Sequence, residues 1–378
     1  MIYFDNSATT VCLPEAQTAA SRYMLERYFN PAAAYAPAVQ TDRDIKNARG
    51  IIASGLRAEP DEVVFTSCGT ESNNTAIFGS LKAMRGKGRV IVSAVEHPSV
   101  YEAALELRES GYDVVFAPVD MTGRADMDAL SELITKDTQL VSIMHVNNES
   151  GAINDIAGVY RLVKAQAPAA LLHVDGVQAF MKEAPVPCDM YSVSGHKLHA
   201  PKGVGALYIR KGVRVKPYLV GGGQEAGMRS GTTNTPAIMG FAAAVSDYQE
   251  HRAEYREGIF AVKERLFNNL SRIKDVMLNG PEIKDGAAHI LNMSFLGVRG
   301  EVLLNALSEK GLCVSTGSAC AAHKRGRNRI LNAMGILGER QDGALRFSFS
   351  HFNTVEEADA AAQMIEAQVN VLRRFKRR

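Results

Sequence analysis

A lysine at the tip of a predicted strand-turn-strand unit is the first residue in the sequence that could do covalent chemistry. Residues 190–193 have the composition of a strand, Ser194-Gly195-His196-Lys197 follows them, and residues 205–209 predict the next strand. An amine that is removed from water has a lowered pKa and attacks aldehydes as the free base. Because most lysines near turns are solvated, Lys197 alone leaves two alternatives, a Schiff-base lysine and a surface lysine.

The start of one predicted helix could hold a phosphate group. The strand-like residues 63–66 lead into Gly69 and Thr70, which open the helix. Unpaired N–H groups and the positive end of the helix dipole attract a phosphate there, and Gly69 allows a close approach. A plain helix start, with Thr70 as the cap and nothing bound, is the alternative.

Polar residues also follow other strand-like runs. They are His97 after residues 89–94, Asn148 after residues 140–146, and Asp175 with Gln178 after residues 171–174. Ligands of parallel sheets collect at the carboxyl ends of the strands. We therefore expect these side chains to converge with Lys197 on one crevice.

This set of residues meets the needs of pyridoxal 5'-phosphate, which requires a lysine for its aldehyde, a carboxylate for its ring nitrogen and donors for its phosphate. Lys197 supplies the lysine, and the charge of Asp175 would keep the ring nitrogen protonated. The other expected contacts are Gly69, Thr70, Ser194 and His196 with the phosphate, Asn148 and Gln178 with the ring oxygen, and His97 stacked on the ring. His97 could also exchange protons near a substrate, although a simple turn histidine before Pro98 is the alternative.

An arginine on a predicted strand could bind a substrate carboxylate. In residues 345–350, strand alternation places Leu345, Phe347 and Phe349 on one face and Arg346 on the other. If the apolar face packs into a core, Arg346 is free to grip a carboxylate with two hydrogen bonds. A solvated surface arginine is the alternative.

One of the five cysteines has the surroundings of a reactive thiol. Cys320 follows the small residues Ser318 and Ala319, and His323, Lys324 and Arg325 come shortly after it. Nearby cations lower the pKa of a thiol and favour the thiolate. Cys313, in a strand-like run, instead fits a structural cysteine.

Strand-like and helical stretches alternate from about residue 63 to residue 210. This pattern predicts an α/β fold with a mostly parallel sheet covered by helices on both faces. A long helical pattern from about residue 235 to residue 267, with a break near Gly258, leads into a smaller α+β part. We expect a large domain at residues 13–250, and a small domain built from residues 1–12 and 251–378.

The net charge, composition and cysteine spacing of the chain exclude several classes of protein. A net charge of +2, with 46% hydrophobic and 22% charged residues, is typical of a soluble globular protein and recruits neither nucleic acid nor an anionic membrane. No run of 18 apolar residues and no signal segment occurs, which predicts a cytoplasmic location. The cysteines lack C-x-x-C spacing, so we expect neither a disulfide framework nor a bound metal.

Taken together, these motifs resemble the cysteine desulfurases of the NifS/IscS-like branch, which are class V aminotransferases with the fold-type I architecture of pyridoxal-phosphate enzymes and a sheet of the seven-stranded type. The resemblance runs from Tyr3 to about Ser350. It is carried by YFDNSATT, FTSCGTESNN, EHPSV, HVNNESG, HVDGVQ, SGHK, GGGQE, MRSGT, STGSAC and LRFSFS.

The resemblance implies a role for each of these residues. Lys197 would be the Schiff-base lysine, Arg346 would bind the carboxylate of L-cysteine with Asn148 nearby, and Cys320 would take the sulfur as a persulfide, leaving alanine. Thr232 would reach the cofactor phosphate of a partner subunit, which implies a homodimer with shared active sites. The sulfur would pass to an acceptor protein for iron–sulfur cluster assembly, transfer RNA thiolation or cofactor sulfuration.

The chain departs from the family pattern in two places. Family members usually carry a serine and a histidine after the Asn-Pro near residue 30, where this chain has Ala32-Ala33-Ala34-Tyr35-Ala36. We also expect the C-terminus to be shorter than in members that dock a scaffold protein there, so a scaffold partner is not carried over. One alternative function is a selenocysteine lyase or cysteine-sulfinate desulfinase, whose leaving groups depend less on a thiol nucleophile. The other, which the altered segment 32–36 motivates, is a cofactor-binding partner protein that has lost turnover.

Overall fold

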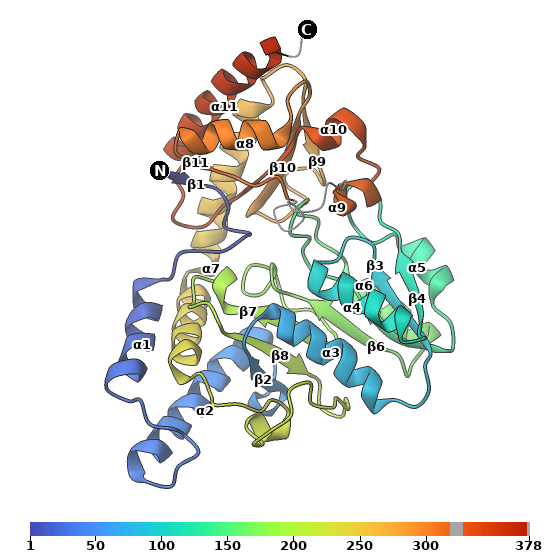
Figure 1. The fold of residues 1–378 in the computed structure, drawn as a ribbon, viewed down its shortest axis with the longest axis vertical. Helices are drawn as coiled ribbons and strands as arrows, with labels where there is room; N and C mark the ends of the chain where they lie inside the picture. Colours follow the sequence, from blue (N-terminus) through green and yellow to red (C-terminus); the bar gives the residue numbers. More distant parts are fainter. Residues whose placement is uncertain (318–327, 376–378) are drawn as a thin grey trace.

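The computed structural model describes residues 1–317 and 328–375 and contains a large and a small sheet, with one long helix running beside both (Figure 1). The large sheet has seven strands in the order β2-β8-β7-β6-β5-β3-β4. Its strands are β2 (Val63–Thr66), β3 (Arg89–Ser93), β4 (Asp113–Ala117), β5 (Thr138–Ser142), β6 (Leu171–Asp175), β7 (Met190–Ser194) and β8 (Gly205–Ile209). Only β8 runs against its neighbours, so the predicted α/β fold with a mostly parallel sheet is confirmed.

Helices cover both faces of the large sheet, because its strands are apolar on both sides. One face packs on α3 (Gly69–Ala83) and α4 (Pro98–Glu109), through residues such as Ile77 and Leu107. The other face packs on α2 (Ala36–Leu56), α6 (Ile156–Gln166) and the first half of α7 (Thr235–Leu270). The remaining helices of this part are α1 (Pro14–Leu25), α5 (Met127–Leu133) and the 3₁₀ turns η1 (Pro60–Glu62), η2 (Gly195–Lys197) and η3 (Glu225–Gly227).

The small sheet is antiparallel, with the strand order β12-β10-β9, and a separate parallel pair joins β1 to β11. These strands are β1 (Ile2–Tyr3), β9 (Val276–Asn279), β10 (Ile290–Phe295), β11 (Leu312–Cys313) and β12 (Ala344–Ser348). The helices around them are α8 (Gly300–Glu309), α9 (Arg329–Ala333), α10 (Gly338–Asp342) and α11 (Val355–Phe375). Leu345, Phe347 and Phe349 lie in the core of this part, as strand alternation predicted.

Helix α7 connects the two parts without the break that was expected at Gly258. Its first half packs on the large sheet through residues such as Phe241, and its second half packs on the small sheet through residues such as Leu266. The predicted boundary between residues 250 and 251 therefore falls inside a continuous helix.

The first ten residues run from the small sheet to the end of β7 (Figure 1). Residues 2 and 3 pair with β11, and Phe4 packs on Phe349 with ring centroids 5.0 Å apart. Six residues later, the backbone N–H and hydroxyl of Thr10 both donate to the carbonyl of His196. We call residues 5–10 the N-terminal arm.

Candidate active site

Lys197 lies in the 3₁₀ turn that follows β7, at the carboxyl end of that strand. Its side chain is half-buried, and its Nζ donates to the carbonyls of Ser7 and Ala8 at 2.5 and 2.6 Å. Both acceptors belong to the N-terminal arm. The arm therefore holds the lysine amine at the edge of the sheet where ligands of parallel sheets bind.

A chain of hydrogen bonds connects Asp175 to His97. Asn73, on α3, donates from Nδ2 to Asp175 Oδ2 at 2.8 Å and to Ser99 Oγ at 2.8 Å. Ser99 Oγ in turn lies 2.8 Å from His97 Nδ1, which also accepts from the Ser99 backbone N–H at 3.2 Å. Since Nδ1 accepts, the remaining proton of the neutral ring is on Nε2. The network thus fixes the carboxylate and the imidazole relative to each other.

The surroundings of His97 favour its neutral form. Burial lowers the pKa of its imidazole, and the positive charges of Lys197 and Arg329 lower it further, while Asp175 opposes this effect. Burial also lowers the pKa of His196 to about 4, with help from Lys197, and its Nδ1 lies 3.2 Å from Thr9 Oγ1. A neutral His97 can stack on an aromatic ring or accept a proton.

The predicted phosphate site brings the start of α3 against the end of β7. A side chain at Gly69 would place its Cβ 2.7 Å from Val177 Cγ2 and 3.5 Å from Ser194 Cβ, so only glycine fits without displacement. No side chain caps α3 at its start, in contrast to the alternative in which Thr70 does so. The N–H groups of the first turn are therefore available to an anion.

Buried polar atoms at this edge lack a hydrogen-bond partner among the described residues. They are Ser194 Oγ, Gln178 Oε1 and Asn148 Oδ1. Gln178 reaches the site because its Nε2 donates to the carbonyl of Ser7 at 3.0 Å, the same carbonyl that Lys197 contacts. Unpaired buried polar groups are costly, so this set fits a polar ring and phosphate. The residues present suit pyridoxal phosphate.

Arg346 is buried and points away from the core of the small sheet, but it is not free. Its Nη2 pairs with Asp5 Oδ1 at 2.8 Å, its Nη1 donates to the carbonyl of Asn148 at 2.9 Å, and its Nε has no partner among the described residues. The predicted carboxylate grip is therefore occupied in part by Asp5. An incoming carboxylate would share the guanidinium or replace Asp5.

We expect Arg346→Ala to raise the KM for a substrate that carries a carboxylate, which the resemblance implies to be L-cysteine, about 10- to 100-fold, because a charge-assisted hydrogen bond contributes about 1.5–3 kcal/mol. The KM and kcat of the reaction measure this effect. Asp5→Asn is the control, since it removes the ion pair and keeps the guanidinium. An equal rise of KM in Asp5→Asn would show that Arg346 acts only by holding the N-terminal arm.

Glu149 contacts both residues that border segment 318–327. Its Oε2 accepts from Asn328 Nδ2 at 2.6 Å, and it would lie 2.6 Å from a Cβ built on Gly317. Glu149 itself is buried, and burial raises its pKa to about 7 although Asn328 and Arg346 lower it. The two ends of the segment are thus joined by one buried carboxyl group beside Asn148.

The raised pKa of Glu149 makes stability depend on pH. Between about pH 4.5 and 7 the folded protein keeps a proton that the unfolded chain loses, so stability falls as the pH rises through this window. The loss amounts to at most about 3 kcal/mol. We expect Glu149→Gln to gain stability relative to the unsubstituted protein from pH 5 to pH 8. Urea unfolding at these pH values measures the gain.

The control for this prediction is Glu109→Gln, which removes an exposed carboxylate at the end of α4. It should leave the pH dependence unchanged. Parallel pH profiles for Glu149→Gln and the unsubstituted protein would contradict the assignment of a raised pKa to Glu149.

Two predicted residues are not brought together with the others. Thr232 is exposed and makes no hydrogen bond with the rest of the set among the described residues, and Cys320 lies outside those residues. The described cysteines are free thiols. Burial raises the pKa of both Cys12 and Cys188, which makes their thiolates unfavourable.

Sequence reasoning missed several residues of this site. They are Asp5, Ser7, Asn73 and Ser99, which each form a hydrogen bond with a predicted residue, and Glu149, whose pKa is raised by burial and lowered in part by the charge of Arg346. Each stands inside one of the motifs quoted above. Asn73 carries the clearest signal, because it lies one helical turn after Gly69, on the same face of α3.

The described residues hold no group of three or more histidine, cysteine, aspartate or glutamate side chains that could bind a metal. Among the described helices, none has the length and apolar character needed to span a bilayer.

The chain is similar to known proteins over almost its whole length. The family "Aminotransferase class-V" matches residues 2–361. "Cysteine desulfurase 2" of Trichormus variabilis is 39% identical over 99% of this chain and 94% of that protein, and "Cysteine desulfurase IscS" of Escherichia coli is 37% identical over 98% and 93%. A solved "NifS-like protein" superposes with a TM-score of 0.92 at 35% identity, covering 98% of this chain and 99% of that chain. The structure "SspA in complex with cysteine" gives 0.81 at 31% identity, covering 94% and 100%.

The fold and the site thus define a member of the class V aminotransferases, a family of pyridoxal-phosphate enzymes. Within that class, the chain belongs to the cysteine desulfurase family. The resemblance predicted from the motifs is confirmed.

Proposed function

We propose that this protein is a pyridoxal-phosphate-dependent cysteine desulfurase that converts L-cysteine to L-alanine and keeps the sulfur as a persulfide on Cys320. The observation that carries the proposal is that Lys197, Asp175 and His97 lie at the carboxyl ends of strands of one sheet, where Asn73 and Ser99 link Asp175 to His97 and the Ser7 carbonyl links Lys197 to Gln178. The family membership supports the same reaction.

The residues at this edge would hold the cofactor. Lys197 would attach its aldehyde, Asp175 would pair with its ring nitrogen, and the start of α3 with Ser194 would bind its phosphate. Gln178 and Asn148 supply unpaired buried oxygens beside the ring position, and His97 lies where it can cover a ring face. Bound pyridoxal phosphate withdraws electrons from the Cα of an attached amino acid, which makes the Cα proton acidic.

The chain itself supplies binding, proton transfer and the nucleophile. Arg346 binds the substrate carboxylate, and the amine of Lys197, once displaced by the substrate amine, removes the Cα proton. The Cys320 thiolate attacks the substrate sulfur, so an S–S bond forms as the Cβ–S bond breaks. The electron pair of the broken bond stays with the carbon skeleton and takes up a proton at Cβ, which gives the methyl group, and Lys197 returns a proton to Cα, which completes alanine.

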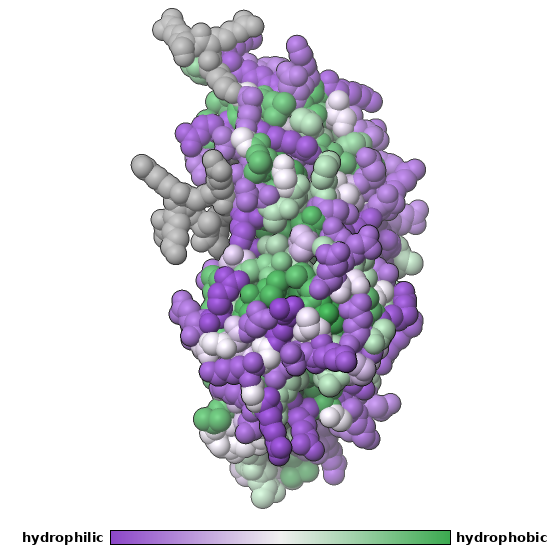
Figure 2. Space-filling view, turned by 90° about the vertical axis from the view of Figure 1, so that its right-hand side faces the viewer, coloured by the Kyte–Doolittle hydropathy of each residue, from purple (hydrophilic) through white to green (hydrophobic). Residues whose placement is uncertain are grey.

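A second copy of the chain would complete the site. Thr232 is exposed on the single chain, where it can meet the phosphate of a partner subunit. Met24, Leu25, Tyr28 and Tyr35 are also exposed around the turn between α1 and α2, and Figure 2 shows apolar surface at this lower tip. Exposed apolar surface of this kind is typical of an interface. We propose a homodimer.

The proposal is tested by mixing the purified protein, loaded with pyridoxal phosphate, with L-cysteine and measuring alanine. We expect stoichiometric alanine followed by turnover when a reducing thiol removes the persulfide. Bound cofactor without any alanine would support a partner protein without turnover, and alanine from selenocysteine or cysteine sulfinate alone would support the lyase or desulfinase.

The protein would act in the cytoplasm, where thiols stay reduced, as the free thiols among the described residues suggest. The physiological acceptor can be identified as the protein that receives labelled sulfur from Cys320.

A further inference from the structure

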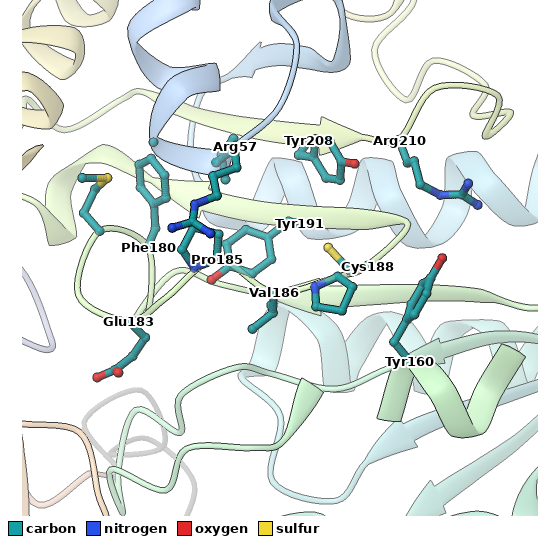
Figure 3. A pocket seen from close by; sticks show the side chains of 14 residues that line it. Arg57, Tyr160, Phe180, Glu183, Pro185, Val186, Cys188, Tyr191, Tyr208 and Arg210 are labelled. Carbon is teal, nitrogen blue, oxygen red and sulfur yellow. The ribbon is translucent and has the colours of Figure 1, made fainter. Parts of the chain in front are cut away.

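A cavity of about 280 Å³ lies on the face of the large sheet opposite the Asp175 side chain. Tyr191 of β7 and Tyr208 of β8 are register partners and line it, together with Tyr160, Phe180 and Arg57 (Figure 3). Tyr191 of β7 is the register partner of Val174 of β6, so the side chains of these two residues lie on the same face of the sheet. Asp175 is the residue after Val174 in β6, and successive residues of a strand point to opposite faces. The Asp175 side chain therefore lies on the other face. The cavity is therefore separate from the candidate active site.

The lining combines aromatic side chains with one arginine, Arg57, that is unpaired among the described residues. Arg210 is paired with Asp189, with both of its contacts at 2.9 Å or less, and Glu183 is paired with Arg256 at 3.0 Å. The exposed guanidinium of Arg57 has neither a hydrogen bond nor an ion pair among the described residues. Figure 3 shows it reaching from the end of α2 toward Pro185 and the ring of Tyr191.

Two hydroxyl groups add to the polar character of the cavity. The side chains of Tyr160 and Tyr208 line it and make no hydrogen bond through their hydroxyls to the described residues. Burial raises the pKa of Tyr208 to about 12, so its hydroxyl keeps its proton and can donate. Arg57 caps the C-terminus of α2 in the left-handed conformation that commonly ends a helix, with φ of 54°.

We propose that this cavity binds a small carboxylate with a flat apolar body, which places the carboxylate on Arg57 and the body against Phe180 and Tyr191. The volume is close to the lower end of the range for small-molecule sites. A guanidinium with nearby hydroxyl donors is suited to a carboxylate, and aromatic walls are suited to a ring.

Tyr191 connects this cavity to the active site. Its hydroxyl lies 3.0 Å from His145 Nδ1, and the backbone N–H of His145 donates to the carbonyl of Asp175 at 2.9 Å. The Tyr191 ring also abuts Gly176, where a Cβ would lie 1.9 Å from it. A ligand stacked on Tyr191 thus contacts a ring that packs directly against the residue after Asp175.

The test uses the cofactor-loaded protein and 3-phenylpropanoate as the probe, with binding measured by isothermal titration calorimetry. We expect binding that weakens at least about tenfold in Arg57→Ala, or when the neutral 3-phenylpropan-1-ol replaces the probe. Arg57→Lys should recover part of the affinity. The matched control is Arg43→Ala, which removes another exposed arginine of α2 and should bind like the unsubstituted protein.

A further variant separates this cavity from the substrate site, where Arg346 could bind the same carboxylate. Arg346→Ala should keep its affinity for the probe. The proposal is overturned if Arg57→Ala binds as tightly as the unsubstituted protein, if Arg346→Ala loses binding, or if millimolar probe gives no binding heat. None of these outcomes depends on desulfurase activity, so the failure of this proposal is distinct from the failure of the proposed function.

Discussion

Replacement of Lys197 by alanine is expected to lower alanine formation from L-cysteine by roughly 10³-fold or more, because in the proposed function the amine would be both the cofactor attachment point and the base. The structure places that amine on two carbonyls of the N-terminal arm, at the carboxyl end of β7. Borohydride reduction followed by peptide mass spectrometry measures the attachment. The peptide that contains residue 197 should carry the cofactor in the unsubstituted protein and should not carry it in Lys197→Ala.

Two further variants make this result specific. Lys197→Arg keeps a positive charge but cannot attach an aldehyde, and so it should be as inactive as Lys197→Ala. Lys202→Ala removes an exposed lysine of the same loop and should keep full activity. Cofactor found on any lysine other than Lys197, at an unchanged rate of alanine formation, would refute the assignment.

Replacement of Cys320 by alanine should abolish transfer of sulfur while leaving cofactor binding intact. We expect alanine formation from L-cysteine to fall at least about 100-fold, because no thiolate remains to take the sulfur. The absorption of the bound cofactor at about 420 nm should persist. Mass spectrometry should find an extra sulfur on Cys320 in the unsubstituted protein after one turnover.

Cys12→Ala is the matched control for Cys320→Ala. Burial raises the pKa of the Cys12 thiol, so this cysteine should not form a persulfide, and its loss should leave turnover unchanged. Undiminished alanine formation by Cys320→Ala would contradict the assignment of Cys320 as the nucleophile. Activity that survives only on cysteine sulfinate or selenocysteine would favour the lyase or desulfinase.

The parts of the site that could be predicted from sequence are those that depend on strand order and periodicity. Asp175 ends β6 and Lys197 follows β7, and these strands are parallel neighbours, so their ends had to meet. Strand alternation likewise predicted that Arg346 points away from Leu345 and Phe347.

The parts that could not be predicted depend on contacts between distant segments. Asn73 and Ser99 look like ordinary polar helix residues until α3 and α4 lie side by side and place them between Asp175 and His97. The sequence likewise gives no reason for Asp5 to meet Arg346, because that contact needs the N-terminal arm to cross from one sheet to the other. The continuity of α7 through Gly258 was also missed, since tertiary packing on both sheets outweighs the low helix propensity of one glycine.

The N-terminal arm also has a consequence for the order of events during synthesis on the ribosome. Asp5 and its partner Arg346 are 341 residues apart in the chain. Strand β1 likewise cannot pair until β11 has been synthesised. Domains form as the nascent chain emerges, so the large sheet can assemble well before the arm finds its partners. Lys197 receives the carbonyls of Ser7 and Ala8 only when the arm is in place. We expect an incomplete polypeptide that lacks β11 and β12 to be unable to form alanine from L-cysteine.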